Sequence, residues 1–339
     1  MRRPSCPLRT AALVLALLGA CSSPPEEAGP ETVLQPWEQA SVLNLLETIP
    51  TGTDLGPRGS PSFWMTWDMA FGAAEESLDL AFFYASDAGP GGALDPGRLT
   101  RLSAAVHGIL AAADRGVAVR FLTDAGFVAT YPALLDHLDA HPGVEVRRYT
   151  MPALDTEGRV VTDPGSDGPR PGVMHAKYLI ADDRQVVLGS ANFDWRALEH
   201  IQELGLSVTD HDTGLVAAYR DVFDLDWHLA GGGTPESAPR PRLTADDLPV
   251  RTWLAPMRGG YIEFEDAHAM PVFSPRGLLP DERLWDLPRL VDAIDGASER
   301  VRVQVLTYKP GTGDRRWGTL DDALRRAASR GVDVRLLVA

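Results

Sequence analysis

The 339-residue sequence predicts an α/β fold in which a mixed, largely parallel sheet is flanked by helices. The first observation is an alternation of strand-like and helix-like segments between residues 78 and 149. The second is that the same order of segments begins again after a linker. The third is an ordinary globular composition, 44% hydrophobic and 23% charged, at a length that suffices for two domains.

The first 20 residues have the features of a secretory signal. Arg2, Arg3 and Arg9 precede an apolar run over residues 11–18, which is too short to span a bilayer as a mature helix. The run ends in Leu18-Gly19-Ala20-Cys21, which is similar to a bacterial lipobox, where the cysteine is acylated and becomes the new N-terminus. The alternative is a plain signal peptide that leaves the cysteine unmodified.

A lipid on Cys21 would anchor the protein in a membrane of the bacterial cell envelope, facing the periplasm or the outer membrane. The other cysteine, Cys6, leaves with the signal, which excludes a disulfide and a thiolate metal site. Residues 21–42 are rich in Pro, Glu and Ser and are predicted to be a flexible tether. The net charge of −15 disfavours duplex nucleic acid, although a local site for one phosphate or a strand end remains compatible with it.

The first domain, predicted over residues 43–230, begins with a βαβαβ pattern. Its strands are apolar runs of strand length, and its helices carry apolar residues at helical spacing. The predicted strands cover residues 78–85, 117–122 and 144–149, and the predicted helices cover residues 99–114 and 131–140. A loop rich in Pro, Gly and Asp follows over residues 152–172.

The remainder of this domain is predicted to return to the sheet as adjacent strands. Residues 173–181 and 185–188 flank Asp182-Asp183-Arg184, which is typical of a tight turn. Another strand is predicted over residues 204–208, and an amphipathic helix over residues 212–229.

A second copy is predicted to start after a linker over residues 231–265. Residues 297–305 resemble residues 74–82, and Arg330-Gly331-Val332 repeats Arg115-Gly116-Val117 at the same step between a helix and a strand. The alternative is that amphipathic α/β segments look alike by chance. The copy over residues 266–339 holds only two strands, too few to bury both faces of a parallel sheet, which predicts that the second domain is incomplete.

The chemistry is expected at His175 and Lys177. Residues two apart on a strand face the same way, so both side chains point to one side of an otherwise apolar segment. An imidazole can attack phosphorus, and an ammonium group can neutralise the phosphate oxygens as negative charge builds. The sequence has only two lysines, Lys177 and Lys309, so this one favours a defined role over a generic surface charge.

The pattern His175-x-Lys177-x4-Asp182-x6-Gly189-Ser190-x-Asn192 resembles the signature of the phospholipase D superfamily. Further matches around it are similar to the animal endolysosomal exonuclease branch of that superfamily, and together they cover about residues 43–339. These matches lie at residues 45–50, 189–196, 203–205 and 321–328.

The resemblance implies the roles of the site residues. His175 would form a phosphohistidine or protonate the leaving group, and Lys177 and Asn192 would hold the phosphate oxygens with support from Ser190. Glu203 would accept a hydrogen bond from the far nitrogen of His175 and so fix its tautomer.

Asp182 belongs to the catalytic motif of this family, but its position on the opposite face of the strand from His175 indicates a structural role. The other histidines have no metal-ligand grouping, and the sequence has no P-loop and no dinucleotide-binding glycine loop. We therefore expect no metal and no organic cofactor, as the family also implies.

The family builds one site from two such motifs, because a nucleophile and an acid are both needed. After Glu203 the histidines are His211, His228 and His268, and none is followed by a lysine two residues later. The sequence therefore predicts a phosphodiesterase, acting on phospholipid or single-stranded nucleic acid, whose second motif lies beyond residue 339 or, less favoured, in a second copy of the chain. The alternative is a lipid-anchored pseudoenzyme that only binds phosphate.

Overall fold

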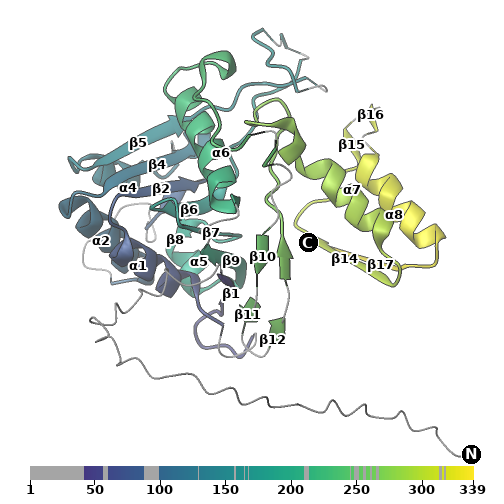
Figure 1. Cartoon of the computed structure of the whole chain (residues 1–339), viewed down its shortest axis with the longest axis horizontal. Coiled ribbons are helices and arrows are strands. Elements are labelled where there is room, and N and C mark those ends of the chain that lie inside the picture. Colours follow the sequence, from purple (N-terminus) through teal and green to yellow (C-terminus); the bar gives the residue numbers. More distant parts are fainter. Residues whose placement is uncertain are drawn as a thin grey trace, which may run out of the picture.

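The structure is a computed structural model (Figure 1). It describes residues 42–55, 60–87, 99–128, 130–155, 158–163, 165–166, 168–209, 214–244, 246–247, 252–254, 257–259, 262–264, 267–312, 315–316 and 318–339. The predicted signal, the acylation of Cys21 and nearly all of the predicted tether lie outside these residues. Within them, no helix is long and apolar enough to cross a membrane.

A nine-stranded sheet, in the order β12-β11-β1-β9-β7-β6-β2-β4-β5, organises the first domain (Figure 1). Its strands are β1 (Val42–Thr48), β2 (Ser77–Phe82), β4 (Ala118–Asp124), β5 (Val144–Tyr149), β6 (Lys177–Ala181), β7 (Gln185–Gly189), β9 (Glu203–Thr209), β11 (Met257–Gly259) and β12 (Ile262–Phe264). A short pair, β3 (Ala85–Ser86) and β8 (Phe193–Asp194), lies apart from it.

The sheet is mixed, as predicted, and its two halves differ in strand direction. Strands β2, β4 and β5 pair in parallel, as the βαβαβ pattern requires. From β2 through β6, β7 and β9 to β1, each successive pair is antiparallel, and short connections join β6 to β7 and β7 to β9. Most strands still point the same way, since only β6, β9 and β12 run opposite to β2.

Helices cover both faces of this sheet and define two apolar cores. One core packs the sheet against α1 (Phe63–Ala73), α2 (Arg101–Asp114) and α4 (Pro132–Asp139). The other packs it against α6 (Leu215–Ala230). Leu179 belongs to the first core and Ile180 to the second, so β6 alternates as predicted. Two short helices, α3 (Ala125–Val128) and α5 (Trp195–Glu199), flank the ends of β4 and β8.

The strand predicted over residues 173–181 is wrong in its first part, since β6 begins only at Lys177. The backbone N–H of Met174 donates to the side chain of Asp124 at 3.0 Å, which holds this segment outside the ladder. The neighbouring strand β2 also ends at Phe82, so residues 173–176 have little to pair with. His175 therefore lies just before the strand and not within it.

The predicted linker over residues 231–265 is not free of secondary structure. A short 3-10 turn, η2 (Pro235–Ser237), follows α6, and β11 pairs in parallel with β1. Without β11, β1 would be the edge of the sheet and its outer backbone groups would be unpaired. This explains why the segment of β11 pairs with it. Two further strands, β10 (Thr252–Leu254) and β13 (Ala267–Ala269), pair with each other.

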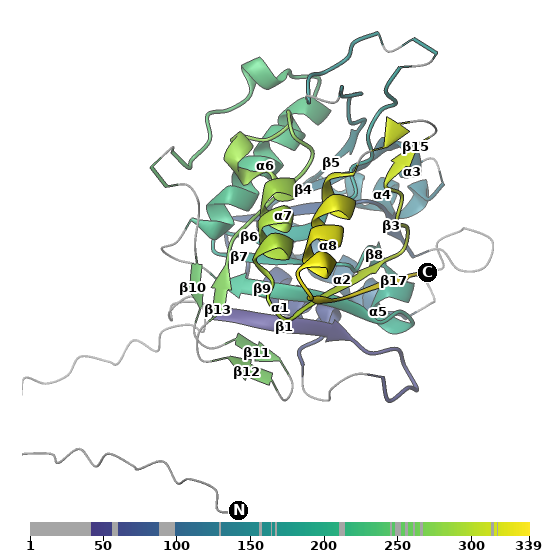
Figure 2. The ribbon, with the colours of Figure 1, turned by 90° about the vertical axis from the view of Figure 1, so that its right-hand side faces the viewer.

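The second repeat has the element order of the first (Figure 2). A 3-10 turn, η3 (Glu282–Leu284), leads into α7 (Asp286–Gly296), β14 (Arg300–Val305), α8 (Thr319–Ser329) and β17 (Asp333–Val338), and β14 pairs in parallel with β17. A short hairpin of β15 (Gly311–Thr312) and β16 (Arg315–Arg316) precedes α8. Figure 2 shows α7 and α8 side by side, as α1 and α2 are in the first repeat.

Two hydrogen-bonding details also recur in the repeats. The guanidinium of Arg115 donates to the carbonyl oxygens of Phe71 and Ala74 at the end of α1, and that of Arg330 donates to Ile294 and Ala297 at the end of α7. Each arginine is followed by a glycine with a left-handed φ, +94° in the first repeat and +89° in the second. Such a glycine ends a helix without strain, so the Arg-Gly pair marks the same turn twice.

Candidate active site

The predicted site residues gather where three strands reach the same edge of the sheet. Tyr178 of β6 lies opposite Leu188 of β7, so the next residues in register, Lys177 and Gly189, lie side by side at this edge. Gly189 is in turn opposite Gly205 of β9. The start of β6, the end of β7 and the start of β9 therefore meet, and the carboxyl ends of β2 and β4 lie at the same edge.

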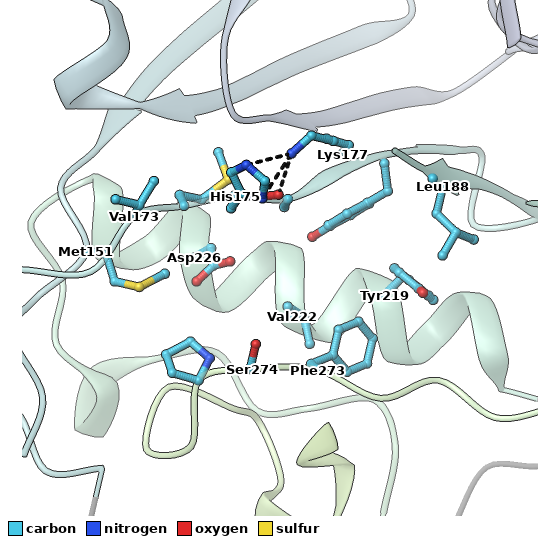
Figure 3. A pocket seen from close by; sticks show the side chains of 15 residues that line it. Met151, Val173, His175, Lys177, Leu188, Tyr219, Val222, Asp226, Phe273 and Ser274 are labelled. Carbon is cyan, nitrogen blue, oxygen red and sulfur yellow. Dashed lines mark hydrogen bonds between the residues drawn. The ribbon is translucent and has the colours of Figure 1, made fainter. Parts of the chain in front are cut away.

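His175 and Lys177 lie against each other on one side of the chain (Figure 3). The Nζ atom of Lys177 is 3.2 Å from Nδ1 of His175 and 3.3 Å from its Nε2, and it donates to the His175 carbonyl at 2.9 Å. The imidazole is exposed, whereas Lys177 is half-buried. An open imidazole beside an ammonium group is an arrangement that can receive a phosphate from solvent.

Burial sets the charge states of this pair. It lowers the pKa of the His175 imidazole from its ordinary 6.5, and the Lys177 charge lowers it further, while the Asp124 carboxylate raises it. Burial also lowers the pKa of Lys177 to about 8, against a smaller raising effect of Glu203. At neutral pH the imidazole is thus neutral, as a nucleophile must be, and the lysine is charged.

Glu203 lies close to the site. Burial raises the pKa of its carboxylate, and the neighbouring Ser190 hydroxyl and Lys177 charge lower it. Ser190 also exchanges hydrogen bonds with the backbone of Leu204, at 3.0 and 3.2 Å. Ser190 therefore joins the end of β7 to the start of β9 beside Lys177, and the predicted role of Glu203 in fixing the His175 tautomer stays a prediction.

Asn192 follows the end of β7 and leads into β8. Its side-chain oxygen is buried and has no hydrogen-bond partner within the described part of the chain. This oxygen is an acceptor that a ligand donor could satisfy, whereas phosphate oxygens would need the amide N–H groups, so the predicted role of Asn192 in holding them stays a prediction.

The sequence reasoning missed Asp124, the last residue of β4. Its carboxylate accepts hydrogen bonds from the backbone of Gly126 and Phe127, at 2.9 and 3.2 Å, and from Met174 at 3.0 Å. It therefore ties the start of α3 to the segment that carries His175. The signal that could have indicated Asp124 was an acid directly after the apolar run of a predicted parallel strand, where sites often lie. The many aspartates of this chain obscured it.

A row of aromatic rings, also missed, extends from His175. The Phe83 ring lies 4.6 Å from the imidazole and 4.1 Å from the Phe127 ring, between centroids. Tyr84 stacks on Phe127 at 5.8 Å and contacts Tyr131 at 5.7 Å. Phe127 is 38% exposed, and both tyrosines are partly exposed, so the row is accessible from solvent next to the catalytic pair.

Asp182 lies at the opposite end of β6 from Lys177. Its carboxylate accepts hydrogen bonds from the backbone N–H groups of Glu75, Glu76 and Ser77, at 2.7 to 2.8 Å. Asp182 and Asp183 have positive φ, 51° and 54°, which is the conformation of the two central residues of a type I′ hairpin. Asp182 thus fastens the β6–β7 turn to the start of β2 and does not touch the reacting centre.

No group of three or more His, Cys, Asp or Glu residues that could hold a metal ion occurs within the residues that the structure describes. The absence of a metal and of a cofactor in the reaction stays a prediction. The groups at the edge are a histidine, a lysine, an amide and a hydroxyl, all of which can contact a phosphate.

Comparison with known proteins agrees with this chemistry. Residues 70–227 match the family described as "Cardiolipin synthase, PLD-like domain". The chain belongs to the phospholipase D superfamily. The predicted likeness to the animal exonuclease branch is confirmed too, since the chain is 30% identical over 308 residues to the 5′-3′ exonuclease PLD3 of Rattus norvegicus.

Other relatives belong to the same superfamily by name. The chain is 27% identical over 310 residues to Phospholipase D Z of Dictyostelium discoideum. This match covers 88% of this chain and 66% of that protein. The match to rat PLD3 covers 87% of this chain and 57% of PLD3, so the chain spans somewhat over half the length of that relative. The solved structure of Nuc from Salmonella typhimurium, a phospholipase D family member, aligns with 56% of this chain and 95% of its own at 17% identity and a TM-score of 0.37.

Proposed function

We propose that this phospholipase D-like chain carries the nucleophilic half of a phosphodiesterase site. The neutral imidazole of His175 attacks phosphorus, a P–N bond forms, and the P–O bond to the leaving group breaks with its electron pair on oxygen. Lys177 neutralises the non-bridging oxygens, and Asn192 donates to them. The observation that carries the proposal is the contact between an exposed imidazole of lowered pKa and a half-buried ammonium group.

A single histidine limits what this site can do alone. An alkoxide leaving group needs a proton, and hydrolysis of the phosphohistidine needs a group that activates water. The second histidine of the family supplies both, and the given sequence has no second His-x-Lys pair. We therefore propose that full turnover needs a further histidine, from more of the chain or from a second copy. The competing function is phosphate binding without chemistry.

Bis(p-nitrophenyl) phosphate separates these two functions, because p-nitrophenolate leaves as a stable anion and needs no acid. We expect a burst of about one p-nitrophenolate per protein, followed by a stall at the phosphohistidine. The adduct would be located on His175 by mass spectrometry, and EDTA would leave the burst unchanged. His175→Gln removes the burst, whereas His107→Gln, at an exposed position on α2, retains it. A chain that binds inorganic phosphate but gives no burst is a pseudoenzyme.

The aromatic row favours single-stranded nucleic acid as the substrate. Bases stack on exposed aromatic rings for about 1 to 3 kcal/mol each, and Phe127 and Tyr84 offer such rings beside His175. The name of rat PLD3, a 5′-3′ exonuclease, points the same way. Phospholipid is the second candidate, which the name of Phospholipase D Z and the predicted lipid anchor favour.

A side-by-side assay decides between these substrates. A short single-stranded oligonucleotide and vesicles of phosphatidylcholine are each given to the chain in single-turnover amounts, and the phosphoryl adduct on His175 is measured. We expect an adduct from the oligonucleotide, and we expect Phe127→Leu to weaken oligonucleotide binding about tenfold, in line with the loss of one stacked base. An adduct from the vesicles alone would assign the lipid.

We also propose that Cys21 is acylated and holds the protein at the bacterial cell envelope. The support is the Leu-Gly-Ala-Cys sequence after a basic and apolar start. Expression in a bacterial host with a labelled fatty acid should label the chain and place it in the membrane fraction. Cys21→Ser should lose both the label and the fractionation. Label that persists in this variant would contradict the proposal.

A further inference from the structure

A cavity of about 510 Å³ lies at the start of β6, and His175 and Lys177 are among the residues that line it. Figure 3 shows His175 and Lys177 above the start of this strand, and Asp226, Val222 and Tyr219 of α6 below it. The segment that carries Phe273 and Ser274 closes the far side. The volume is within the range of cavities that hold small organic ligands, about 300 to 1,000 Å³.

Away from His175 and Lys177, most of the lining of this cavity is apolar or aromatic. The rings of Tyr178, Tyr219 and Phe273 form a connected wall, with centroids 5.2 Å apart for the first pair and 4.8 Å for the second. Asp226 is the one acid of the lining, and in Figure 3 its carboxylate points into the same space as the hydroxyl of Ser274. The cavity therefore holds one acid together with an aromatic wall.

Asp226 has no protein counter-charge in the described structure. No ion pair or hydrogen bond to its carboxylate is found among the described residues, unlike Asp224 on the same helix, which pairs with Arg120 at 2.9 Å. Burial raises the pKa of Asp226 to about 7, and no cation of the described chain lowers it. A half-buried carboxylate in a largely apolar lining is costly unless a cation joins it, so the cavity favours a ligand that brings one.

We propose that this cavity binds an organic ammonium ion with an apolar chain, such as a primary alkylamine. The ammonium group donates to the carboxylate of Asp226 and the hydroxyl of Ser274 and lies against the ring faces of Tyr178 and Tyr219. The apolar chain fills the space between Val222, Met151 and Phe273. The site adjoins His175 and Lys177 but does not depend on the proposed phosphodiesterase chemistry, because its ligand is held by Asp226 and Ser274.

Calorimetric titration of the full chain with n-octylamine, n-octanol and octanoate tests this proposal. These probes share a chain and differ in charge at the head. We expect octylamine to bind at least about tenfold more tightly than octanol, and octanoate to bind most weakly, because a charged pair in a partly closed site contributes about tenfold or more. Equal affinities for octylamine and octanol would overturn the proposal.

Two variants locate the binding. Asp226→Asn keeps the shape and removes a carboxylate that is buried at a cost, so the protein should fold, and the advantage of octylamine over octanol should vanish. Val222→Phe fills the cavity and should weaken all three probes. Asp68→Asn, at an exposed position on α1, is the matched control and should change nothing. Octylamine binding that survives both cavity variants would place the amine elsewhere and overturn the proposal.

Discussion

The Nζ atom of Lys177 lies 3.2 and 3.3 Å from the two ring nitrogens of His175, which places the ammonium group over the face of the imidazole. Its donation to the His175 carbonyl oxygen at 2.9 Å holds it there. A phosphate that enters this site would meet the nucleophile and its counter-charge together. The proximity also works against protonation of the imidazole.

The pH dependence of the p-nitrophenolate burst should therefore have two limbs. Attack needs neutral His175, whose pKa burial and the lysine hold below 6.5, so the rate rises with pH through that lowered pKa and then levels. It falls again above about pH 8, where Lys177 loses its proton. Stopped-flow absorbance over pH 4 to 10 measures both limbs.

Lys177→Arg is the matched variant for the alkaline limb. Arginine stays charged throughout this range, so the fall above about pH 8 should disappear even where the altered geometry slows the burst. A fall that persists in Lys177→Arg would mean that another group sets this limb.

Asp124→Asn should move the acid limb to lower pH. The Asp124 carboxylate raises the pKa of His175, so a neutral amide at this position lets burial and the Lys177 charge lower that pKa further. NMR titration of the His175 ring protons measures the change directly and does not require catalysis. Asp68→Asn, remote from the site, should leave the titration unchanged, and an unmoved curve in Asp124→Asn would show that this carboxylate does not act on the imidazole.

Asp182→Asn should affect folding and not chemistry. The charged carboxylate accepts three backbone hydrogen bonds before β2, and asparagine keeps the left-handed turn but loses the charge. We expect the free energy of unfolding in urea to fall by about 1 to 2 kcal/mol. The burst per folded molecule should match the parent chain, and a lost burst with normal stability would return Asp182 to the catalytic group.

A buried ion cluster should be a main contributor to stability on the α6 side. Asp79 is fully buried and pairs with both Arg120 and Arg220. Arg220→Met leaves Asp79 and Asp183 short of a cation and should cost about 3 kcal/mol or more in urea unfolding. The double variant Asp79→Leu with Arg220→Met should recover part of this loss. If the losses in unfolding free energy of the single variants Asp79→Leu and Arg220→Met simply add up in the double variant, Asp79 and Arg220 are not coupled.

The features of the fold that depend on local periodicity could be predicted from the sequence. The alternation after Met174 placed Leu179 and Ile180 in opposite cores, and the run over residues 144–149 became β5 without change. It missed α1, because Met65 and Met69 lie on the solvent side of this helix and blur the apolar face that marks an amphipathic helix.

The site was predictable as a set of residue types and less so as a set of contacts. The motif spacing brought Lys177 and Gly189 to one edge, because strand register follows from a tight turn. The surroundings of Glu203 did not follow from the motif, because strand pairing brings the Ser190 hydroxyl beside its carboxylate. Asp124 comes from a strand far away in sequence, and only tertiary packing brings it to Met174.

The motif glycine, Gly189, is a last case where packing and not chemistry explains a residue. A Cβ atom built there would lie 2.5 Å from the Phe63 ring and 2.6 Å from the Leu204 carbonyl oxygen. Both are closer than side-chain carbons are found, and the backbone atom cannot move aside without disturbing the β7–β9 ladder. Gly189→Ala should therefore lower the free energy of unfolding by about 1 to 3 kcal/mol.

Phe63→Leu in the same chain separates the two contacts. The smaller side chain relieves the clash with the ring but not the one with the carbonyl. Gly189→Ala should therefore cost less free energy of unfolding in a Phe63→Leu background than in the parent chain, but it should still cost some. Gly72→Ala on α1, where a Cβ meets nothing within 4 Å, is the matched control and should be neutral or slightly stabilising. Full recovery would mean that the ring alone excludes a side chain, and a stable Gly189→Ala would mean that β7 and β9 are further apart than the structure has them.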